Sequence, residues 1–332
     1  MHVVVTGACG FLGIKLIEAI VAQGHLIGAD GRAQPISRIV AADILSKPFG
    51  LPADGRISYH SGDIFDSEFV ASLFAERPES IFHLAALVSG GAERDFDSGM
   101  KANLTGTTNV LEAARRTAVC PRFVFTSSVA AYGGDLPEIV SDEYHLTPES
   151  SYGVQKAVGE LLVNDYTRKG YIDGRSLRLP IIAVRPEGAN TAVSSWASAI
   201  IREPLSGVDY ACPVAPEDRG FILSPRKVIE GLIVGHEASN DVWGRNRSVM
   251  MAGLSCTAGE LVDALSRIAG AKVAKRVNWS PDPFVRNIIT SWPTRFSLEK
   301  ARRIGLEADP SVDDIVTQYV KDHACGDHHR GN

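Results

Sequence analysis

Short apolar runs alternate with segments of helical periodicity along the first half of the chain. Apolar runs of strand length lie at residues 3–5, 36–43, 57–64, 80–88, 123–128 and 178–185. Segments in which apolar residues recur every three or four positions lie at residues 14–22, 67–75, 100–117 and 152–168. Strands and helices that alternate in this order predict an α/β fold with a doubly wound parallel sheet.

The pattern of apolar and polar residues changes after residue 185. Residues 190–202, 209–221 and 243–292 mix helical patterns with proline-rich loops and contain few strong strands. The sequence contains neither an internal repeat nor a linker long enough to separate two lobes. We therefore predict a first domain over residues 1–185, a smaller mixed α/β lobe over most of residues 186–322, and a disordered tail over residues 323–332.

Composition and charge argue against two classes of partner. Of the 332 residues, 45% are hydrophobic and 22% are charged, and the formal net charge is −5. Such a chain has no basic field to attract nucleic acid or an anionic membrane. No apolar segment approaches the roughly 20 residues that a membrane span needs, and the chain opens into a strand without a charged leader. We expect a cytoplasmic protein with neither a nucleic-acid nor a membrane partner.

The cysteines and histidines show no disulfide framework. Cys9, Cys120, Cys212, Cys256 and Cys325 are scattered without a Cys-x-x-Cys pair, which predicts free thiols in a reducing compartment. Possible metal ligands crowd together at residues 323–329, where a solvated terminus explains them better than a metal site does. We therefore expect no metal.

A glycine-rich turn stands between the first strand and the first helix. Gly7, Gly10 and Gly13 follow the run 3–5 and precede the helical segment 14–22. Gly7 permits the tight turn, Gly10 lets the backbone approach a pyrophosphate, and Gly13 lets helix and strand pack closely. The free N–H groups of the helix N-terminus attract the anion. This context predicts dinucleotide binding.

Two aspartates compete for the position that holds the adenosine ribose. Asp30 lies at the usual distance of roughly 20 residues beyond the glycines, but glycines and a proline interrupt the surrounding run. Asp43 ends the more regular strand 36–43, which leaves residues 24–35 as a long connecting loop. We favour Asp43 and keep Asp30 as the alternative. An acid at either position suits a free 2′-hydroxyl and repels a 2′-phosphate, so NAD is expected in preference to NADP.

Tyr152 and Lys156 lie one helical turn apart on one face of the segment 152–168. A nearby ammonium favours the phenolate, so we expect Lys156 to lower the pKa of Tyr152 from its usual value of about 10. The phenol could then take a proton from a substrate hydroxyl. Ser128 ends the strand 123–128, at the sheet edge where α/β proteins present their sites. A lone Tyr-x-x-x-Lys is common, and its weight here comes from the neighbouring signals.

The ends of two further strands carry residues suited to a cofactor. Asp63 and Ile64 end the run 57–64, where they would flank an adenine. Ala85 and Ala86 lie in the run 80–88, where small side chains let the backbone pass close to phosphates. Tight packing of a helix on the sheet explains the two alanines equally well.

A series of motifs, in order along the first 185 residues, resembles the extended short-chain dehydrogenase/reductase family, which includes NAD-dependent epimerases and dehydratases. The motifs are Thr6-Gly-x-x-Gly-x-x-Gly13, Gly62-Asp63, His83-Leu-Ala-Ala86, Asn103, Thr126-Ser-Ser128, Tyr152-x-x-x-Lys156 and Leu177-Arg-Leu-Pro180. The resemblance implies a Rossmann domain in which Tyr152 is the general base, Lys156 lowers its pKa and holds the nicotinamide ribose, and Ser128 bonds the reacting oxygen. The NAD site that it implies consists of Gly7, Gly10, Phe11, Leu12, Gly13, Asp43, Asp63, Ile64, Leu84, Ala85, Ala86, Asn103, Ser127, Tyr152, Lys156, Pro180 and Ile182.

Further segments resemble a group of sugar-acid dehydrogenases within that family. These segments are residues 88–91, 189–195, 198–205, 208–213 and 292–296, so the resemblance covers nearly the whole chain. It implies NAD-dependent oxidation of the 2-hydroxyl of a four-carbon sugar acid to the 2-oxo acid. The chain departs from that group at Glu187, where glycine is usual, and in the loop 28–33. These departures bear on the substrate more than on the chemistry.

A sugar acid needs a cation in the second lobe. Arg185, Arg202 and Arg219 are available, and a guanidinium meets a carboxylate in a bidentate pair. An internal salt bridge with Glu203 or Glu217 is the competing role for Arg202. The expected substrate residues are Ser89, Ser128, Asn190, Arg185 and Arg202.

Other functions could use the same residues. A nucleotide-sugar epimerase or dehydratase would recycle its NAD on the same Ser128, Tyr152 and Lys156, and a uronate or another aldonate could replace the four-carbon acid. A redox-sensing binding protein would use the fold without catalysis and would not need Tyr152 and Lys156 together. The segments 100–117 and 152–168 carry apolar residues on more than one face, and such helices pair across a two-fold axis in the resembling family, so a homodimer is expected.

Overall fold

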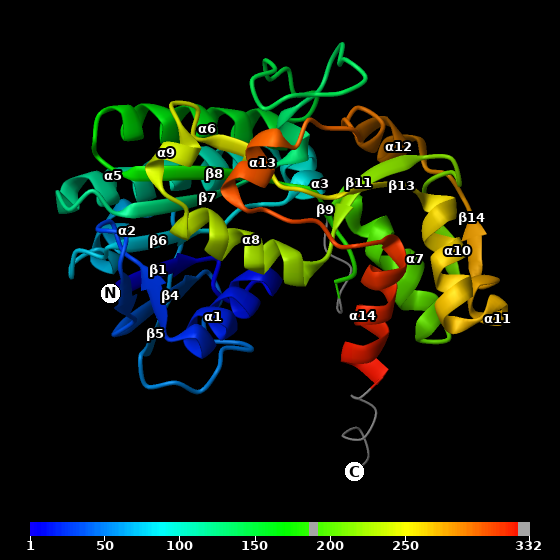
Figure 1. The fold of residues 1–332 in the computed structure, drawn as a ribbon, viewed down its shortest axis with the longest axis horizontal. Helices are drawn as coiled ribbons and strands as arrows, with labels where there is room; N and C mark the ends of the chain where they lie inside the picture. Colours follow the sequence, from blue (N-terminus) through cyan, green and yellow to red (C-terminus); the bar gives the residue numbers. More distant parts are fainter. Residues whose placement is uncertain (186–191, 325–332) are drawn as a thin grey trace.

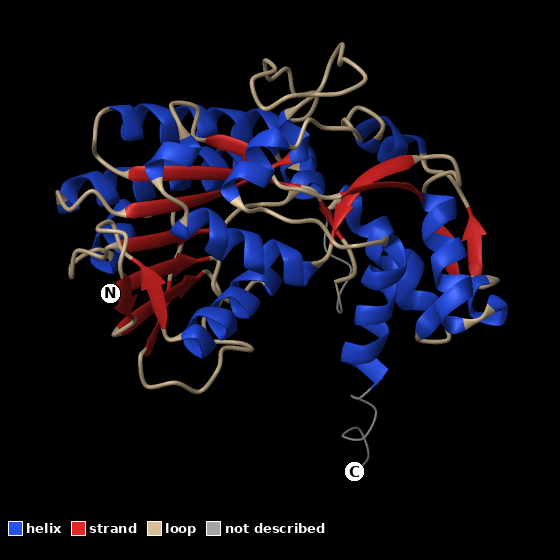
Figure 2. Ribbon diagram, viewed as in Figure 1, coloured by secondary structure: helices blue, strands red, loops and turns tan. Residues whose placement is uncertain are grey.

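A computed structural model gives the fold of the chain and describes residues 1–185 and 192–324. Seven parallel strands form its central sheet, in the order β12-β8-β7-β6-β1-β4-β5 (Figures 1 and 2). The strands are β1 (His2–Thr6), β4 (Arg38–Asp43), β5 (Ile57–Ser61), β6 (Ser80–His83), β7 (Arg122–Ser128), β8 (Asp173–Leu179) and β12 (Ser248–Met250). The predicted doubly wound parallel sheet is confirmed.

Helices cover both faces of this sheet (Figure 1). Successive side chains of a strand point to opposite faces, so Val3 and Val5 of β1 belong to one apolar cluster and Val4 to another. The first cluster lies under α1 (Phe11–Gln23) and α8 (Pro225–Glu237), and the second under α2 (Ser67–Leu73), α5 (Thr107–Thr117) and α6 (Ser151–Arg168). All three valines are fully buried. Burial on both faces explains why the parallel strands read as continuous apolar runs.

The strand expected at residues 178–185 is displaced. Strand β8 spans Asp173–Leu179 and ends before Pro180, which has no N–H for the ladder. Ile181–Ile182 forms β9, which belongs to a different sheet. The sequence pattern missed the start of β8 because Asp173 and Arg175 are charged, although they pair with each other and are buried.

Other elements also differ from the expectation. The loop at residues 24–35 contains an antiparallel hairpin, β2 (His25–Ile27) and β3 (Ala33–Pro35). The run 80–88 forms strand only over β6, and the chain then enters α3 (Ser89–Arg94) and α4 (Phe96–Gly99). The predicted helix 100–117 begins as a π-helical segment, η1 (Met100–Gly106), and continues as α5. A 3₁₀ turn, η2 (Val129–Ala131), follows β7.

A smaller lobe holds two further sheets, and it occupies the right of Figure 1. Its strands are β9 with β11 (Arg219–Leu223) and β13 (Leu254–Thr257), and β10 (Tyr210–Cys212) with β14 (Val277–Trp279). Its helices are η3 (Val193–Ser195), α7 (Trp196–Leu205), α10 (Ala258–Ala269), α11 (Ala271–Ala274), α12 (Pro283–Ile289) and α14 (Val312–Ala324). The buried Trp196 lies in the apolar cluster of this lobe.

The second half of the chain returns to the large sheet. Helices α8, α9 (Asn240–Trp243) and α13 (Glu299–Ile304) and strand β12 share the apolar cluster of α1. Val228 and Leu232 of α8, for example, are fully buried in the cluster that contains Leu16. The smaller lobe already begins with β9 at Ile181, before the predicted boundary at residue 185, and segments beyond residue 185 complete the first lobe.

The described residues also bear on membrane, metal and thiols. Within residues 1–185 and 192–324, no helix is long and apolar enough to cross a membrane, and no three His, Cys, Asp or Glu side chains are grouped to hold a metal ion. Cys9, Cys120, Cys212 and Cys256 are free thiols. Of the predicted tail, residues 323 and 324 end α14, and Cys325 and the residues after it lie outside the described part of the chain.

Candidate active site

The predicted cofactor residues gather along one end of the parallel sheet. The glycine turn follows β1, Asp43 ends β4, Asp63 and Ile64 follow β5, and Pro180 follows β8. The chain crosses from β5 to β6 between the two halves of the sheet, so β1 and β6 lie side by side at the switch point. Ligands of open α/β sheets bind outside the carboxyl ends of the strands at such a point.

The glycine turn leaves no room for side chains. Gly7 has φ +71°, and a Cβ there would lie 2.7 Å from the backbone nitrogen of Ala85. A Cβ on Gly13 would lie 2.2 Å from the carbonyl oxygen of Gly7. Helix α1 begins at Phe11 with no side-chain cap and no acidic residue in its first turn, which also includes Leu12. This bare helix N-terminus beside a close-packed turn fits a pyrophosphate.

Asp43 and Asp30 lie in different settings. The Asp43 carboxylate accepts a hydrogen bond of 2.9 Å from the backbone N–H of Cys9, inside the glycine turn. Asp30 lies in the turn of the β2–β3 hairpin, where it accepts from the backbone of Arg32 and the side chain of Gln34. The geometry therefore favours Asp43 for a ribose bound beside the turn.

The loop after β6 is held by a buried amide. The Asn103 side chain accepts from the N–H of Leu87 (2.8 Å) and donates to its carbonyl (2.9 Å). It also donates to the side chain of Gln155 on α6 (2.7 Å). Leu84, Ala85 and Ala86 are thus fixed next to the glycine turn. Asn103 acts here by shaping the loop.

Ser128, Tyr152 and Lys156 come together at the carboxyl end of β7. The Ser128 hydroxyl lies close enough to the phenol of Tyr152 to lower the pKa of that phenol. The Lys156 Nζ lies 5.7 Å from the centre of the Tyr152 ring and donates to the Thr126 carbonyl (2.8 Å). Lys156 is 3% exposed. The structure therefore brings the three predicted residues into one group.

The resting electrostatics differ from the expectation that Lys156 lowers the pKa of Tyr152. Burial raises the pKa of Tyr152 to about 12, and the hydrogen bond from Ser128 only partly opposes it. Burial also lowers the pKa of Lys156 to about 7, against the charge of Glu160. Desolvation disfavours the charged form of both groups and outweighs their mutual attraction. The resting pair is therefore closer to phenol and neutral amine than to phenolate and ammonium.

The arginines of the predicted substrate site have different partners. Arg202 forms an ion pair with Glu203 (2.7 Å), its competing role, and donates to the Arg185 carbonyl. Arg219 lies 3.6 Å from Glu260 at the surface. For Arg185, no carboxylate in the described part of the chain lies within ion-pair distance, and burial lowers its pKa to about 10, helped by the charge of Arg202.

Two further substrate residues were predicted. Ser89 is buried at the start of α3, and its hydroxyl accepts a hydrogen bond of 3.3 Å from the Val193 backbone N–H at the start of η3. It therefore links the two lobes. Asn190 lies outside the described residues.

A profile of the NAD dependent epimerase/dehydratase family matches residues 3–214. The chain belongs to this family. It is 46% identical to a D-erythronate dehydrogenase of Cupriavidus necator over 97% of this chain and 98% of the relative. It is 35% identical to a D-erythronate dehydrogenase of Haemophilus influenzae over 97% and 99% of the two chains.

A solved structure shares the whole architecture. It is described as a nucleoside-diphosphate-sugar epimerase from Agrobacterium tumefaciens, with a TM-score of 0.91 and 37% identity over 98% of this chain and 95% of the other. The resemblance deduced from the motifs is confirmed, and the chain is an oxidoreductase of the CH–OH group with a nicotinamide cofactor.

The sequence reasoning missed the residues behind the reacting pair of this epimerase/dehydratase fold. The Ser127 hydroxyl, predicted to contact the cofactor, donates to the buried carboxylate of Glu160 (2.5 Å). Arg178 of β8 forms a bidentate pair with the same carboxylate. The spacing from Tyr152 to Lys156 to Glu160 places all three on one face of α6, and this signal was available in the sequence.

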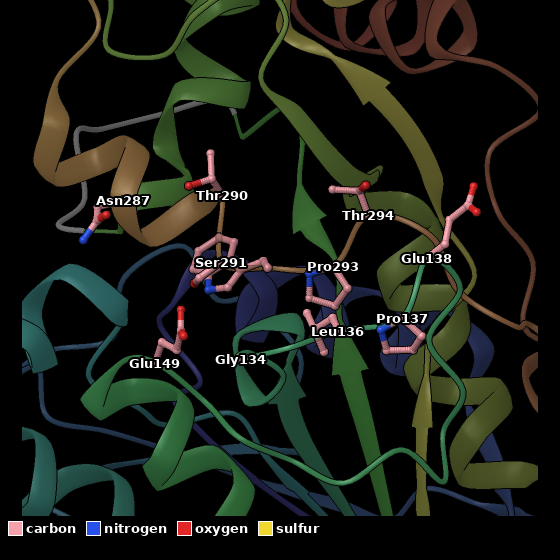
Figure 3. A pocket seen from close by; sticks show the side chains of 11 residues that line it. Gly134, Leu136, Pro137, Glu138, Glu149, Asn287, Thr290, Ser291, Pro293 and Thr294 are labelled. Carbon is pink, nitrogen blue, oxygen red and sulfur yellow. The ribbon is translucent and has the colours of Figure 1, made fainter.

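A cavity of about 500 Å³ borders the N-terminal end of α6. Figure 3 shows Ser291, Pro293 and Thr294 above Gly134, Leu136 and Pro137, with Glu149 at the lower left beside Gly134. It is lined by Gly134, Leu136, Pro137, Glu138, Glu149, Asn287, Thr290, Ser291, Trp292, Pro293 and Thr294. None of the predicted site residues lines it, so the cavity adjoins the chemical site and does not contain it.

Proposed function

We propose that this chain is a NAD-dependent D-erythronate dehydrogenase, which oxidises the 2-hydroxyl of the four-carbon acid to a 2-oxo acid. Similarity over nearly the full length to two relatives of that name supports the substrate. The grouping of Ser128, Tyr152 and Lys156 supports the chemistry. The observation that carries the proposal is Arg185, a mostly buried cation for which the described residues supply no acid partner.

The chain's own residues would hold the cofactor. The bare N-terminus of α1 and the turn at Gly7 and Gly10 would bind the pyrophosphate, and Asp43 would bind the adenosine ribose. The acid at this position favours NAD over NADP because a 2′-phosphate would meet a carboxylate. When bound, NAD supplies the hydride acceptor.

Proton removal depends on Tyr152 and Lys156 as a coupled pair. The first proton leaves the pair with an apparent pKa of about 7, mainly as the buried ammonium neutralises. The resulting state is a mixture of phenol with amine and a small population of phenolate with ammonium, in a ratio that does not change with pH. Ser128 would hold the reacting oxygen, and the phenolate of Tyr152 would take its proton.

Arg185 would orient the substrate. A guanidinium in low dielectric binds a carboxylate through two parallel hydrogen bonds, which fixes position as well as charge. Because Arg202 is paired with Glu203, the positive charge of Arg185 is left for a ligand. A sugar acid bound there would have its carboxylate fixed while an adjacent hydroxyl faces the reacting pair.

A nucleotide-sugar epimerase is the second candidate, because the structure from Agrobacterium tumefaciens carries that description. Such an enzyme would return the hydride to its substrate and release no NADH. Mixing the protein with NAD and D-erythronate should raise the absorbance of NADH, with weaker responses to other aldonates and to uronates. Thermal stabilisation by a UDP-sugar, with no NADH from any acid, would favour the epimerase.

The homodimer and the cytoplasmic location stay predictions. Leu161 and Val154 on α6 are 65% and 46% exposed, which is consistent with a face covered by a second copy. Light scattering should give twice the mass of 35.6 kDa. A Leu161→Lys variant should shift the protein toward the monomer.

A further inference from the structure

Helix α6 meets the end of β7 through a row of three side chains. Tyr152, Lys156 and Glu160 are spaced four residues apart, so they share one face of the helix. Their neighbours are consecutive in β7: Ser128 acts on the phenol of Tyr152, the Thr126 carbonyl accepts from Lys156, and the Ser127 hydroxyl donates to Glu160. The third member of the row has no role in the proton transfer described above.

Glu160 is a buried and fully engaged carboxylate. It is 2% exposed, and Arg178 donates to it through Nε (2.9 Å) and Nη2 (2.7 Å). The Ser127 hydroxyl supplies a further hydrogen bond. The carboxylate is one half of a buried ion pair with the Arg178 guanidinium. A fixed negative charge therefore lies one helical turn behind Lys156.

The groups around Lys156 leave Glu160 as its main counter-charge. His83 of β6 faces Lys156 but is neutral, since burial and the charge of Lys156 lower its pKa to about 3. The Phe125 ring lies 4.7 Å from the ammonium and favours its charge weakly. Glu160 is the carboxylate whose charge opposes the lowering of the Lys156 pKa by burial.

Further charged groups lie on the far side of Glu160 from Lys156. Arg178 also lies 3.6 Å from Asp142 and contacts the hydroxyl of Tyr132. Burial holds Tyr132 neutral by raising its pKa. Lys300, whose ammonium donates to two backbone carbonyls, is the further cation that acts on Asp142. Glu143 is a further acid that acts on Asp142 and Lys300. Of the acids in this network, Glu160 is the one whose charge acts on Lys156.

We infer that Glu160 is a positioning residue that favours the ammonium form of Lys156 against its burial and thereby sets how much Tyr152 phenolate the enzyme contains. This inference rests on the proposed function, because it needs Tyr152 to be the base. Its effect is specific to one protonation equilibrium. Removing the carboxylate would make Lys156 easier to neutralise but would hardly change the ionisation of Tyr152 beside a charged Lys156.

This selectivity predicts a particular pH profile. At low pH both partners are protonated, and the phenolate population depends on the acidity of Tyr152 alone. Above the apparent pKa of the pair, the population is set by competition between the phenol and the ammonium to lose the proton. A variant with a less basic Lys156 therefore keeps its rate at low pH and loses rate on the plateau. The loss is tenfold for each unit by which the pKa of Lys156 falls.

The test compares kcat/KM for D-erythronate oxidation between about pH 5 and pH 9 in the wild type and in Glu160→Gln. We expect the break in the profile to move down by about one pH unit and the plateau to fall about tenfold, while the acid limbs coincide. Glu112→Gln is the control. Like Glu160, Glu112 bonds an arginine and a hydroxyl group, here Arg115 and the hydroxyl of Tyr166, but it lies on α5. Its profile should match the wild type. A profile of Glu160→Gln that is lowered equally at every pH would show a merely structural role and overturn the inference.

A second readout does not need turnover. In protein labelled with ¹³C at lysine Cε and free of substrate, the pH titration of the Lys156 signal, assigned with Lys156→Arg, should have a lower midpoint in Glu160→Gln. An unchanged midpoint would overturn the inference whatever the rates. A lowered midpoint in a protein that forms no NADH from any acid would contradict the proposed function alone.

If the glutamine variant does not fold, Glu160→Asp replaces it, because it keeps the charge but withdraws it by one methylene. Its pH profile should diverge from that of the wild type on the plateau in the same way, by a smaller factor. Parallel profiles and an unchanged midpoint would again overturn the inference.

Discussion

Two buried clusters of charge lie at opposite ends of the strands of the central sheet, and β8 contributes to both. At the carboxyl end, Arg178 pairs with Glu160 and lies close to Asp142. At the amino end, Asp173 is shared by Arg122, Arg175 and Arg247 at 3.7, 2.8 and 2.5 Å. Both clusters are made of the same residue types and are almost completely buried.

The amino-end cluster fastens a helix. Arg122 donates to the carbonyl of His236 and Arg175 to the carbonyl of Ala238, at the C-terminal end of α8. Cations are favourable there because the carbonyls at the end of a helix carry partial negative charge. The cluster holds three arginines for one carboxylate, and burial lowers the pKa of Arg175 to about 9.

The carboxyl-end cluster differs in what it touches. Glu160 bonds Ser127 and lies one helical turn from Lys156, so its charge reaches the reacting pair. The comparison teaches that burial and charge pairing alone do not indicate catalysis. A position at the carboxyl end of a parallel sheet does indicate catalysis, because ligands bind at that end.

The largest effect should come from removing the cation of the reacting pair. Lys156→Met abolishes the ammonium that favours the Tyr152 phenolate, so kcat/KM for D-erythronate should fall about 10²–10⁴-fold at pH 8. Stopped-flow recording of NADH formation measures this loss. A fall of less than threefold would remove Lys156 from the chemistry.

Breaking the amino-end cluster should affect stability and leave catalysis intact. Asp173→Asn leaves three buried arginines without an ionised partner, which should cost roughly 3–5 kcal/mol of unfolding free energy in urea titration. The break in the pH profile of kcat/KM should stay where it is in the wild type. A displaced break would mean that the two clusters are coupled.

Asp142 gives the carboxyl-end cluster a pH-dependent stability. Burial raises its pKa to about 6, above the value of about 3.8 expected for the unfolded chain, so the folded protein binds this proton more tightly. Stability should therefore fall, by up to roughly 3 kcal/mol, as the pH rises from about 4 to about 6. Asp142→Asn should remove this slope from the unfolding free energies. An identical slope in the variant would assign it to other groups.

Arg185 lies beyond the carboxyl end of β8 and belongs to neither cluster, so it tests whether a cation at that end of the sheet binds the substrate. In Arg185→Met the carboxylate of the substrate loses a charge-assisted pair of about 2 kcal/mol, so KM should rise roughly 30-fold with a smaller change in kcat. Arg219→Met is the matched control, since Arg219 is already near Glu260, and its KM should stay close to that of the wild type. Equal changes in the two variants would remove Arg185 from the substrate site.

The parts of the fold with local signals could be predicted from the sequence. Apolar runs such as Val3 to Val5 and the glycine turn depend on neighbours in the chain, so their patterns are visible without the structure. The π-helical start of η1 and the hairpin at residues 24–35 carried no such signal. The start of β8 was missed because Asp173 and Arg175 hide a buried strand behind charged side chains.

The candidate site shows the same division. Tyr152 and Lys156 were found from their spacing, since residues four apart on a helix share a face. The pKa of Tyr152 was expected to fall, whereas burial raises it, because desolvation depends on the three-dimensional packing around the pair. The link from Glu160 to Arg178 joins α6 to β8 and has no local pattern. The partner of a buried charge is set by tertiary contacts.

The most direct test of the account is the rate of NADH formation from NAD and D-erythronate by the wild type and by Tyr152→Phe, with NAD binding measured in parallel by quenching of tryptophan fluorescence. We predict steady NADH formation by the wild type, and a loss of at least about 10³-fold in the variant with NAD affinity retained. A variant as fast as the wild type would contradict the assignment of Tyr152 as the base, and a wild type that forms no NADH would contradict the proposed reaction.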